Sequence, residues 1–401
     1  MKNSWSIFRN LTVLSLEQAT VVPYLSFRLA QDGVRVIRLE HPVVCDPNRM
    51  VGSPFVPGED KMCSYFFAFN SGKEAITLNL KEPRGQEILR RLIKTLDVDI
   101  FMTNQLPKSY QTLGIDYESL SSVKPDIIWV GVTGFGPDSN EAAYDPILQA
   151  RGGLMELTGE PGGDPQVMGV PLPDVGASEH AYGMVMKALF KRAVTGEGSR
   201  IDVIMFQSTV SWLTQPITMA TTFGRVMKRR GNTHEFFSPT SVFPTSDGYV
   251  YIATGNNAQW ERLVALPGFE HLDEPRYKTN AGRIADVREL NRRLAEVTRK
   301  FNTAELIEIL HNIKVPVSKV QSIPEVCEDP AIKDKFLRSM DPITGFKVTM
   351  APPPTMTDYL RDAGQTLSFP PRLGEHNQAI YGGALGMTQE ELDALKRDGV
   401  I

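Results

Sequence analysis

The amino-acid sequence predicts an α/β protein with a mostly parallel β-sheet covered by helices, followed by a second, smaller α+β domain. Three observations support this fold class. Strands and helices alternate through the first third of the chain, and those strands are nearly continuous apolar runs, as in a sheet buried on both faces. Near residue 226 the pattern changes to a β-hairpin followed by helices. The length of 401 residues, with 41% hydrophobic and 22% charged residues, is ordinary for a globular protein of two or three domains.

The first third of the chain supplies most of the predicted sheet. Strands are predicted at residues 11–16, 34–39, 76–80, 98–103 and 127–133, and helices at 23–31 and 83–96. Pro23 near the start of the first helix and Gly33 just past its end follow the usual helix preferences. In the second helix, Ile88, Leu89 and Leu92 fall on one stripe, which predicts that this face packs on the sheet.

The middle of the chain is predicted to contain a loop region, a long helix and a hairpin. Residues 144–173 are rich in Gly and Pro and indicate an elaborated loop. The helix that follows carries Ala181, Val185 and Leu189 at helical spacing and ends near Gly196. A strand at 200–205 and a helical stretch to residue 223 come next. The hairpin spans 241–243 and 249–253, with helices at 257–265, 283–301, 304–312 and, near the end of the chain, 388–398.

Charge, apolar runs and cysteines exclude several classes of function. The net charge of -4 and a pI of about 6.0 argue against a broad nucleic-acid surface. No apolar run approaches the length of a membrane span, and residues 1–12 lack the apolar core of a signal peptide. Cys45, Cys63 and Cys327 form no CxxC pair, so we expect neither a zinc ribbon nor a disulfide framework, and the reducing cytoplasm is the expected compartment.

The common motifs of α/β enzymes are absent from the sequence. The first strand-to-helix turn, residues 17–23, contains no glycine, whereas a dinucleotide site needs GxGxxG there. No GxxxxGK[ST] loop and no GxSxG elbow occurs, and the six histidines show no HxH or HxxxH spacing for a metal. A dehydrogenase of standard type, a nucleotide hydrolase, a serine hydrolase and a zinc enzyme are therefore disfavoured.

One carboxylate has a position that suits chemistry. Asp174 directly precedes the long amphipathic helix, where unpaired backbone N–H groups favour the ionised form. An ionised carboxylate can act as a nucleophile in covalent catalysis. An aspartate at this position can equally serve only as a helix cap. The local sequence leaves both interpretations open.

The chain resembles the class III CoA-transferases, the family that includes formyl-CoA transferase and carnitine CoA-transferase. The resemblance runs almost end to end and rests on segments in the family's order. These segments are Asn70-Ser71-Gly72-Lys73; Tyr144-Asp145-Pro146 with Gln149-Ala150 and Gly153; Gly169 to Asp174; Thr195-Gly196-Glu197-Gly198 with Ile201-Asp202-Val203; and Pro371-Arg372-Leu373-Gly374-Glu375-His376. Their ordered combination is far more specific than any one of them.

The resemblance implies a fold and an assembly. It implies a large Rossmann-like CoA-binding domain built from both chain ends, with a small domain from the middle. We therefore expect the large domain with its linker helix over residues 1–225, the small domain over 226–325, and a return linker with the C-terminal part of the large domain over 326–401. Two such chains are expected to interlock as a homodimer, and some family members pair with a related subunit instead.

The resemblance also implies a mechanism in which Asp174 attacks the thioester of a donor acyl-CoA. The CoA then passes through an aspartyl-CoA thioester to an acceptor carboxylic acid. Coenzyme A thioesters are substrates, and no tightly bound cofactor, ATP or metal is implied, since thioester exchange is nearly balanced in free energy. We expect succinyl-CoA as donor and a larger acceptor, an aromatic or substituted dicarboxylic acid. The aromatic residues that suggest such an acceptor, and that core packing explains equally well, are Tyr65, Phe66, Phe67, Phe236 and Phe237.

CoA contacts are carried over from the family position by position. The matching residues are Ala19, Thr20, His41, Asn104, Gln105, Leu113, Thr133 and Phe135. Two departures concern the CoA phosphates, because Glu74 and Thr112 stand where the family often has arginine, which suits bidentate phosphate binding. Lys73, Arg49 or Lys108 are expected to compensate.

Two alternatives stay open. The α-methylacyl-CoA racemases of the same family pair the aspartate that matches Asp174 with a histidine, where this chain has Tyr144. A tyrosine is a poor general base at neutral pH. The second alternative is a non-catalytic subunit of a hetero-oligomeric CoA-transferase, which the lost arginines would suit and the retained Asp174 would not.

Overall fold

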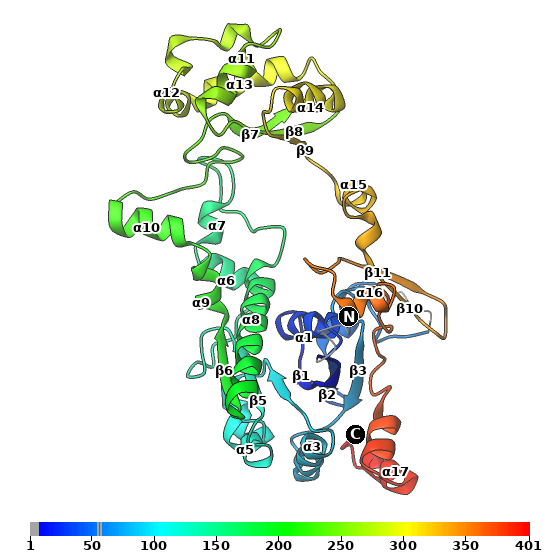
Figure 1. Ribbon diagram of the computed structural model, residues 1–401. Helices are drawn as coiled ribbons and strands as arrows, with labels where there is room; N and C mark the ends of the chain where they lie inside the picture. The colour runs from blue at the N-terminus through cyan, green and yellow to red at the C-terminus, as the bar shows by residue number, and fades with distance from the viewer. Residues whose placement is uncertain (1–7, 54–55, 57) are drawn as a thin grey trace. The chain divides into compact units, whose positions relative to one another are not determined.

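The protein, described by a computed structural model over residues 8–53, 56 and 58–401, forms two compact units (Figure 1). Unit 1 combines the chain up to Gly153 with Met168–Thr221 and Asp334–Ile401, and unit 2 combines Leu154–Val167 with Thr222–Lys333. Part of the segment examined for a signal peptide, residues 1–7, lies outside the described residues. The segment Leu154–Val167 groups with unit 2 because Gly231 N donates to Gly159 O at 2.8 Å.

Unit 1 is built on a six-stranded parallel sheet, which confirms the predicted α/β class. The strands are β1 (Thr12–Leu16), β2 (Arg35–Glu40), β3 (Lys73–Thr77), β4 (Ile100–Thr103), β5 (Ile128–Thr133) and β6 (Ser199–Ile204). Their order is β3-β2-β1-β4-β5-β6, so the strand order reverses between β1 and β4. In open α/β sheets, ligands bind outside the carboxyl ends of the strands at such a reversal.

The third strand differs from its prediction. The apolar run at 76–80 predicts a strand there, but β3 is Lys73–Thr77 and pairs with β2 from Val36↔Lys73 to Glu40↔Thr77. Lys73 is a strand residue with only 2% of its surface exposed. A lysine is rarely buried unless it is paired, so its place in the sheet depends on a partner distant in sequence.

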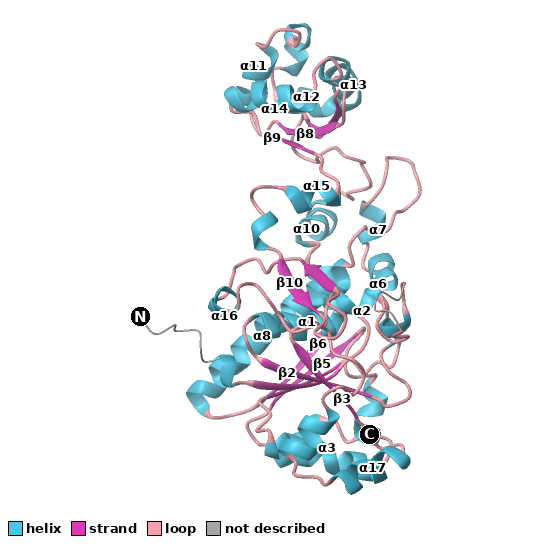
Figure 2. Cartoon of the chain, turned by 90° about the vertical axis from the view of Figure 1, so that its right-hand side faces the viewer, coloured by secondary structure: helices cyan, strands magenta, loops and turns pink. Residues whose placement is uncertain are grey.

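Helices cover both faces of the sheet (Figure 2). One face packs against α1 (Val21–Gln31) and α8 (Leu172–Thr195), in a core that includes Val13 of β1. The opposite face, with Leu14, packs against α3 (Pro83–Thr95), α5 (Tyr117–Val123) and α17 (Gln389–Arg397). The other helices of unit 1 are α2 (Ser64–Phe67), α4 (Tyr110–Leu113), α6 (Asp145–Arg151) and α9 (Met205–Ser211), while α10 (Thr214–Phe223) ends in unit 2 and α7 (Leu154–Leu157) belongs to unit 2. Thus α6 and α7 lie within the predicted loop region 144–173.

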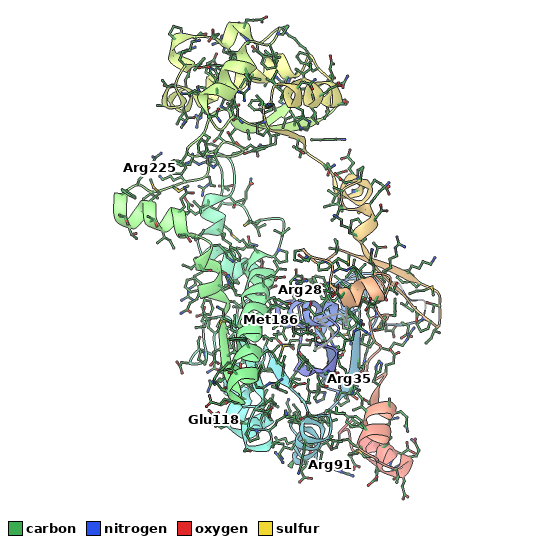
Figure 3. The ribbon with its side chains drawn as sticks, in the orientation of Figure 1. Arg28, Arg35, Arg91, Glu118, Met186 and Arg225 are labelled. Atoms are coloured by element: carbon green, nitrogen blue, oxygen red, sulfur yellow. The ribbon has the colours of Figure 1, made fainter. Side chains whose placement is uncertain are left out.

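The helices α1 and α8 pack against each other and are joined by side-chain hydrogen bonds. Ser178 Oγ donates to the carbonyl of Val21 at 2.5 Å, close to the N-terminal ends of both helices. Further along, Arg28 Nε donates to Glu179 Oε1 at 2.8 Å, and Arg28 and Met186 line one surface cavity (Figure 3). This packing fixes the first turns of α1 and α8 relative to each other.

The C-terminal segment returns to unit 1 and binds the free edge of β3. It contains β10 (Leu337–Met340), β11 (Lys347–Met350) and α16 (Asp358–Asp362) before α17. Ala75 N donates to His376 Nδ1 at 3.1 Å, and Thr77 N donates to Asn377 Oδ1 at 2.9 Å. Side-chain acceptors therefore satisfy backbone donors of the edge strand that no further strand would pair.

Unit 2 is a small α+β body. Its antiparallel sheet has the order β7-β8-β9, with β7 (Thr240–Pro244), β8 (Tyr249–Ala253) and β9 (Val317–Lys319), which confirms the predicted hairpin. Its helices are α11 (Asn257–Val264), α12 (Asn280–Ala285), α13 (Val287–Thr298), α14 (Thr303–Asn312) and α15 (Ile323–Glu328). The single helix expected over 283–301 is therefore two helices. Among the described residues, no helix is both long and apolar enough to span a membrane.

Candidate active site

A cavity of about 310 Å³ lies at the carboxyl ends of β1, β4 and β5, beside the strand-order reversal. Its walls come from the turn after β1, the turn after β4, the loop after β5, the start of α6 and the first turn of α8. The predicted residues that line it are Ala19, Thr20, Asn104, Gln105, Thr133 and Asp174. No lysine, arginine or histidine is among the lining residues in the described part of the chain.

Asp174 lies in the first turn of α8, which begins at Leu172. Burial, together with the negative charge of Asp145, raises the pKa of the Asp174 carboxyl to about 7. The sequence predicted the opposite, because it placed the carboxylate at a helix N-terminus, where partial positive charge favours ionisation. Loss of water and a second carboxylate outweigh that effect.

Asp145 is the neighbour that the sequence did not assign to the site. It is the first residue of α6 and is buried. Its Oδ2 accepts the backbone N–H of Asp174 at 3.3 Å, and its Oδ1 accepts Gln149 Nε2 at 2.6 Å. Burial raises the pKa of Asp145, while these two hydrogen bonds lower it. Among the described residues, no ion pair joins a cation to either aspartate. The signal available in the sequence was Tyr144-Asp145-Pro146, which served only as a mark of resemblance.

The turn between β1 and α1 is held by side chains from two other segments. Asn104 accepts Gln18 N at 3.2 Å and donates to Gln18 O at 2.8 Å. Ala19 has a φ of 60°, its N–H donates to Asp46 Oδ1 at 3.0 Å, and its carbonyl accepts Asn48 Nδ2 at 2.7 Å. A positive φ is unusual for alanine, and these contacts maintain it. Asn104 and Ala19 therefore shape the wall of the cavity more than they offer free polar groups to a ligand.

A second cavity of about 220 Å³ holds two further predicted residues. His41 and Leu113 line it, and Gln105 lines both cavities. Burial lowers the pKa of His41, and the charge of Lys81 lowers it too. His41 Nδ1 accepts the backbone N–H groups of residues 43 and 44, each at 3.1 Å. Lys81, an exposed cation that the sequence reasoning did not name, also lines this cavity.

Arg49 and Lys73 do not reach either cavity. Lys73 Nζ donates to Glu17 at 2.8 Å, to the Pro23 carbonyl at 2.9 Å and to Asn70 at 2.9 Å, which uses all three of its donors. Arg49 donates to Glu40 at 2.6 Å and to the Pro371 carbonyl at 3.1 Å, among other contacts. Both side chains are buried, and burial of a charge requires that it be paired. Neither residue lines a cavity, and both use their charges within the protein, so compensation for the CoA phosphates by Arg49 or Lys73 stays a prediction.

Three further residues discussed for the CoA site, Glu74, Lys108 and Phe135, do not line either cavity. Glu74 pairs with Arg35 through hydrogen bonds of 2.7 and 2.9 Å, so its charge is compensated on the sheet. Lys108 is exposed and is not among the residues that line the two cavities, whereas its neighbours Leu106 and Ser109 line the first. Phe135 packs against Phe206, with the Arg151 guanidinium 4.2 Å from its ring centroid, and does not line either cavity.

The aromatic residues considered for an acceptor pocket do not form one group. Phe66 and Phe67 are buried in unit 1, and the ring of Phe66 lies 3.9 Å from the Arg49 guanidinium. Tyr65 is 41% exposed, and its hydroxyl is 3.1 Å from Thr20 Oγ1. Phe236 and Phe237 belong to unit 2. Only Tyr65 contacts a residue that lines the cavity of Asp174.

The family model for CoA-transferase family III matches residues 8–377. The chain belongs to CoA-transferase family III. It is 32% identical over 395 residues to a succinate--glutarate CoA-transferase of Agrobacterium fabrum, covering 95% of this chain and 96% of that protein. It is 31% identical to the succinyl-CoA:glutarate CoA-transferase of Mus musculus, covering 100% of this chain and 91% of that protein.

Solved structures agree with the family assignment. A CAIB/BAIF family protein from Brucella suis matches with a TM-score of 0.80 and 32% identity, over 92% of this chain and 97% of that one. This family III member is accordingly an enzyme with CoA-transferase activity, and acyl-CoA and carboxylic acids are the substrates of that activity. In the described residues, no group of three or more His, Cys, Asp and Glu side chains is arranged to hold a metal ion.

Proposed function

We propose that this enzyme transfers CoA from succinyl-CoA to a second dicarboxylic acid through an aspartyl-CoA thioester on Asp174. The observation that carries the proposal is the Asp174 carboxylate, which lines a cavity at the strand-order reversal without a cation beside it in the described chain. A desolvated carboxylate has lost much of the hydration that otherwise shields its oxygens, which favours its use as a nucleophile.

The first half of the proposed reaction loads the enzyme. An Asp174 oxygen attacks the thioester carbonyl carbon of succinyl-CoA, the C–S bond breaks, and a mixed anhydride and CoA thiolate form. The thiolate then attacks the aspartyl carbonyl of the anhydride, and succinate leaves as a carboxylate. No net proton is gained or lost, and the enzyme holds CoA as an aspartyl thioester.

The second half unloads it by the same chemistry. The acceptor carboxylate attacks the aspartyl thioester, which forms a second mixed anhydride and releases CoA thiolate. The thiolate attacks the acceptor carbonyl, and Asp174 regains its carboxylate. Each attack places negative charge on a carbonyl oxygen. The first N–H groups of a helix lack intrahelical partners, so the start of α1 at Val21, which lines the cavity, offers donors for that oxygen.

We place CoA across the two cavities. Gln105 lines both, so the thioester end at Asp174 and the nucleotide end beside His41 and Leu113 can belong to one extended ligand. Lys81 then supplies a cation near the CoA phosphates, in place of the family's arginines at the positions of Glu74 and Thr112. The predicted contacts Ala19, Thr20, Asn104 and Thr133 would form the wall around the thioester end.

The names of two relatives support the choice of substrates. Both relatives described above are named for transfer between succinate or succinyl-CoA and glutarate, which supports succinyl-CoA as donor and a glutarate-like acid as the first acceptor to test. The aromatic or substituted dicarboxylic acids expected from the sequence belong in the same panel, because Tyr65 contacts the cavity through Thr20.

The test is mass spectrometry of the purified enzyme after incubation with succinyl-CoA. We expect CoA on the peptide that contains Asp174, and no adduct in Asp174→Asn, whose turnover should fall by about 1000-fold or more. Asp334→Asn, an exposed aspartate on the same chain, is the matched control and should keep both adduct and turnover. Absence of an adduct with every donor tested would overturn the proposal. An α-proton exchange assay on the same samples then tests the racemase alternative.

We further propose a homodimer that functions in the cytoplasm. No residue of α10 is buried in the single chain, and apolar Phe223 is 67% exposed, which supports coverage by a second copy. The free thiols of Cys45, Cys63 and Cys327 suit a reducing compartment. Light scattering of the purified chain should give twice the mass of one chain. Failure of the chain by itself to bind CoA would favour the hetero-oligomer instead.

A further inference from the structure

Gln149 forms a hydrogen-bonded bridge behind the two aspartates. It lies on α6, four residues after Asp145, and is 1% exposed. Its Nε2 donates to Asp145 Oδ1 at 2.6 Å, and its Oε1 accepts the backbone N–H of Met168 at 2.9 Å. Asp145 Oδ2 in turn accepts the N–H of Asp174 at 3.3 Å. The bridge therefore runs from residue 168 through α6 to residue 174, and closes the loop that leads into α8.

The chemistry of the bridge requires an amide. The backbone N–H of Met168 is a donor, so the side chain at position 149 must accept a hydrogen bond from it. The Asp145 carboxylate is an acceptor, so the same side chain must also donate a hydrogen bond to it. Glutamine does both, and the two contacts fix which end of the amide is oxygen. A glutamate would place an acceptor against Asp145, and a methionine of similar size could do neither.

Asp145 needs such a restraint because it faces a like charge. Asp145 and Asp174 line the same cavity, and repulsion favours rotation of Asp145 away from Asp174. The other titratable side chains that line the cavity are Glu141, which pairs with Arg151 at 3.0 Å, and exposed Tyr144. The contacts that hold the Asp145 carboxylate are those from Gln149 and from the Asp174 backbone.

We propose that Gln149 is a positioning residue for the transferase reaction, which holds Asp145 against the first turn of α8 and so fixes the direction in which Asp174 meets the thioester. This proposal rests on the proposed function of Asp174. Gln149 itself need not touch substrate, because it acts through Asp145. Its loss should therefore slow the attack by Asp174 while CoA binding, which uses other walls of the two cavities, stays nearly unchanged.

The test measures the rate at which the Asp174 peptide acquires CoA in a single turnover. We expect Gln149→Met to slow this step and kcat by about 10- to 100-fold, as for other small misplacements of reacting groups, with KM for the acyl-CoA changed less than about threefold. Gln149→Glu, tested at pH 8, keeps an acceptor for Met168 N and should slow the step similarly. Gln31→Met is the matched control, a buried glutamine on α1 that bonds to Arg28, and should leave the rate unchanged.

A double-mutant cycle separates positioning from a structural role. In an Asp145→Asn background, Gln149→Met should have little further effect, because the two residues act as one unit. If the fold-decrease in rate of the double variant equalled the product of the two single decreases, the proposal would be overturned. An unchanged single-turnover rate in both Gln149 variants would also overturn it. If Gln149→Met fails to fold, Gln149→Glu decides the question. Absence of an adduct in the unaltered enzyme would instead defeat the proposed function, so the two failures are distinguishable.

Discussion

Two groups of buried or half-buried carboxylates lie at the carboxyl end of the same sheet, and they differ in the charges beside them. In the first, Glu17, Glu40 and Asp46 are joined to three cations through ion pairs of 2.6 to 3.6 Å. The three cations are Arg38, Arg49 and Lys73. In the second, Asp145 and Asp174 face each other, with no cation paired to either in the described chain.

The pKa values of Glu17 and Glu40 in the first group are lowered, whereas those of Asp145 and Asp174 in the second are raised. In the first, burial raises the pKa of Glu40, but Arg38 and Arg49 more than offset it and bring it to about 2. In the second, burial and a like charge raise the pKa of Asp174 to about 7. Burial is thus common to both, and the partner decides the outcome. The first group is a neutralised cluster beside the turns around the cavities, while the second is the unneutralised pair that contains the proposed nucleophile.

We expect the largest change in stability when one cation is removed from the first group. Lys73→Met leaves Glu17 buried without its closest cation, and we expect the free energy of unfolding at pH 7, where Lys73 is charged, to fall by about 3–5 kcal/mol. Chemical denaturation measures this. The control Lys81→Met, an exposed lysine, should change stability by less than about 0.5 kcal/mol. Equal stability of the two variants would show that the first group is not the structural one.

Removing a charge from the second group should have the opposite sign. Asp174 loses its proton near pH 4 when unfolded and near 7 when folded, so the folded state binds more protons between these values. Its stability contribution therefore falls as pH rises from about 4 to about 7. We expect Asp174→Asn to be more stable than the natural chain by about 1–3 kcal/mol at pH 8, and by nearly nothing at pH 3. A loss of stability at pH 8 would contradict the interpretation of Asp174 as an unneutralised charge.

The pH dependence of activity tests the same pKa from the other direction. The proposed nucleophile is the ionised form, so kcat/KM should rise about tenfold per pH unit below about 7 and level off above it. Steady-state rates with succinyl-CoA over pH 5.5 to 8.5 give this profile. A flat profile across that range would place the pKa of the nucleophile near that of an ordinary aspartate.

The smallest expected effect concerns the second cavity. Lys81 lines this cavity and is exposed, whereas Lys73 is buried in an ion pair with Glu17. Its substitution should therefore affect ligand binding and not the stability of the fold. We expect Lys81→Met to raise KM for the acyl-CoA about 3- to 10-fold with kcat unchanged, as for loss of one exposed charge-assisted contact. Dephospho-CoA thioesters serve as the control, since a lost phosphate contact should matter less with them. An unchanged KM would remove Lys81 from the proposed CoA site.

Residue patterns alone predicted much of the fold. The apolar strands and the stripe of Ile88, Leu89 and Leu92 led to a parallel sheet covered by helices, because periodicity reports which face is buried. Asp174 was found as a candidate from its place before α8 and from the order of the family segments. The strand β3 was misplaced because Lys73 is polar, and local patterns cannot show that Glu17, 56 residues earlier, neutralises it.

The sequence by itself determined the fold class, the family and the candidate nucleophile, because these depend on local periodicity and on ordered motifs. The tertiary structure decided which charges face each other. It placed Lys73 and Arg49 in buried ion pairs, brought Asp145 to Asp174 across 29 residues of chain, and so reversed the expected pKa shift of the candidate nucleophile. Electrostatic interaction depends on distance in space and on burial, and neither quantity is carried by spacing along the chain.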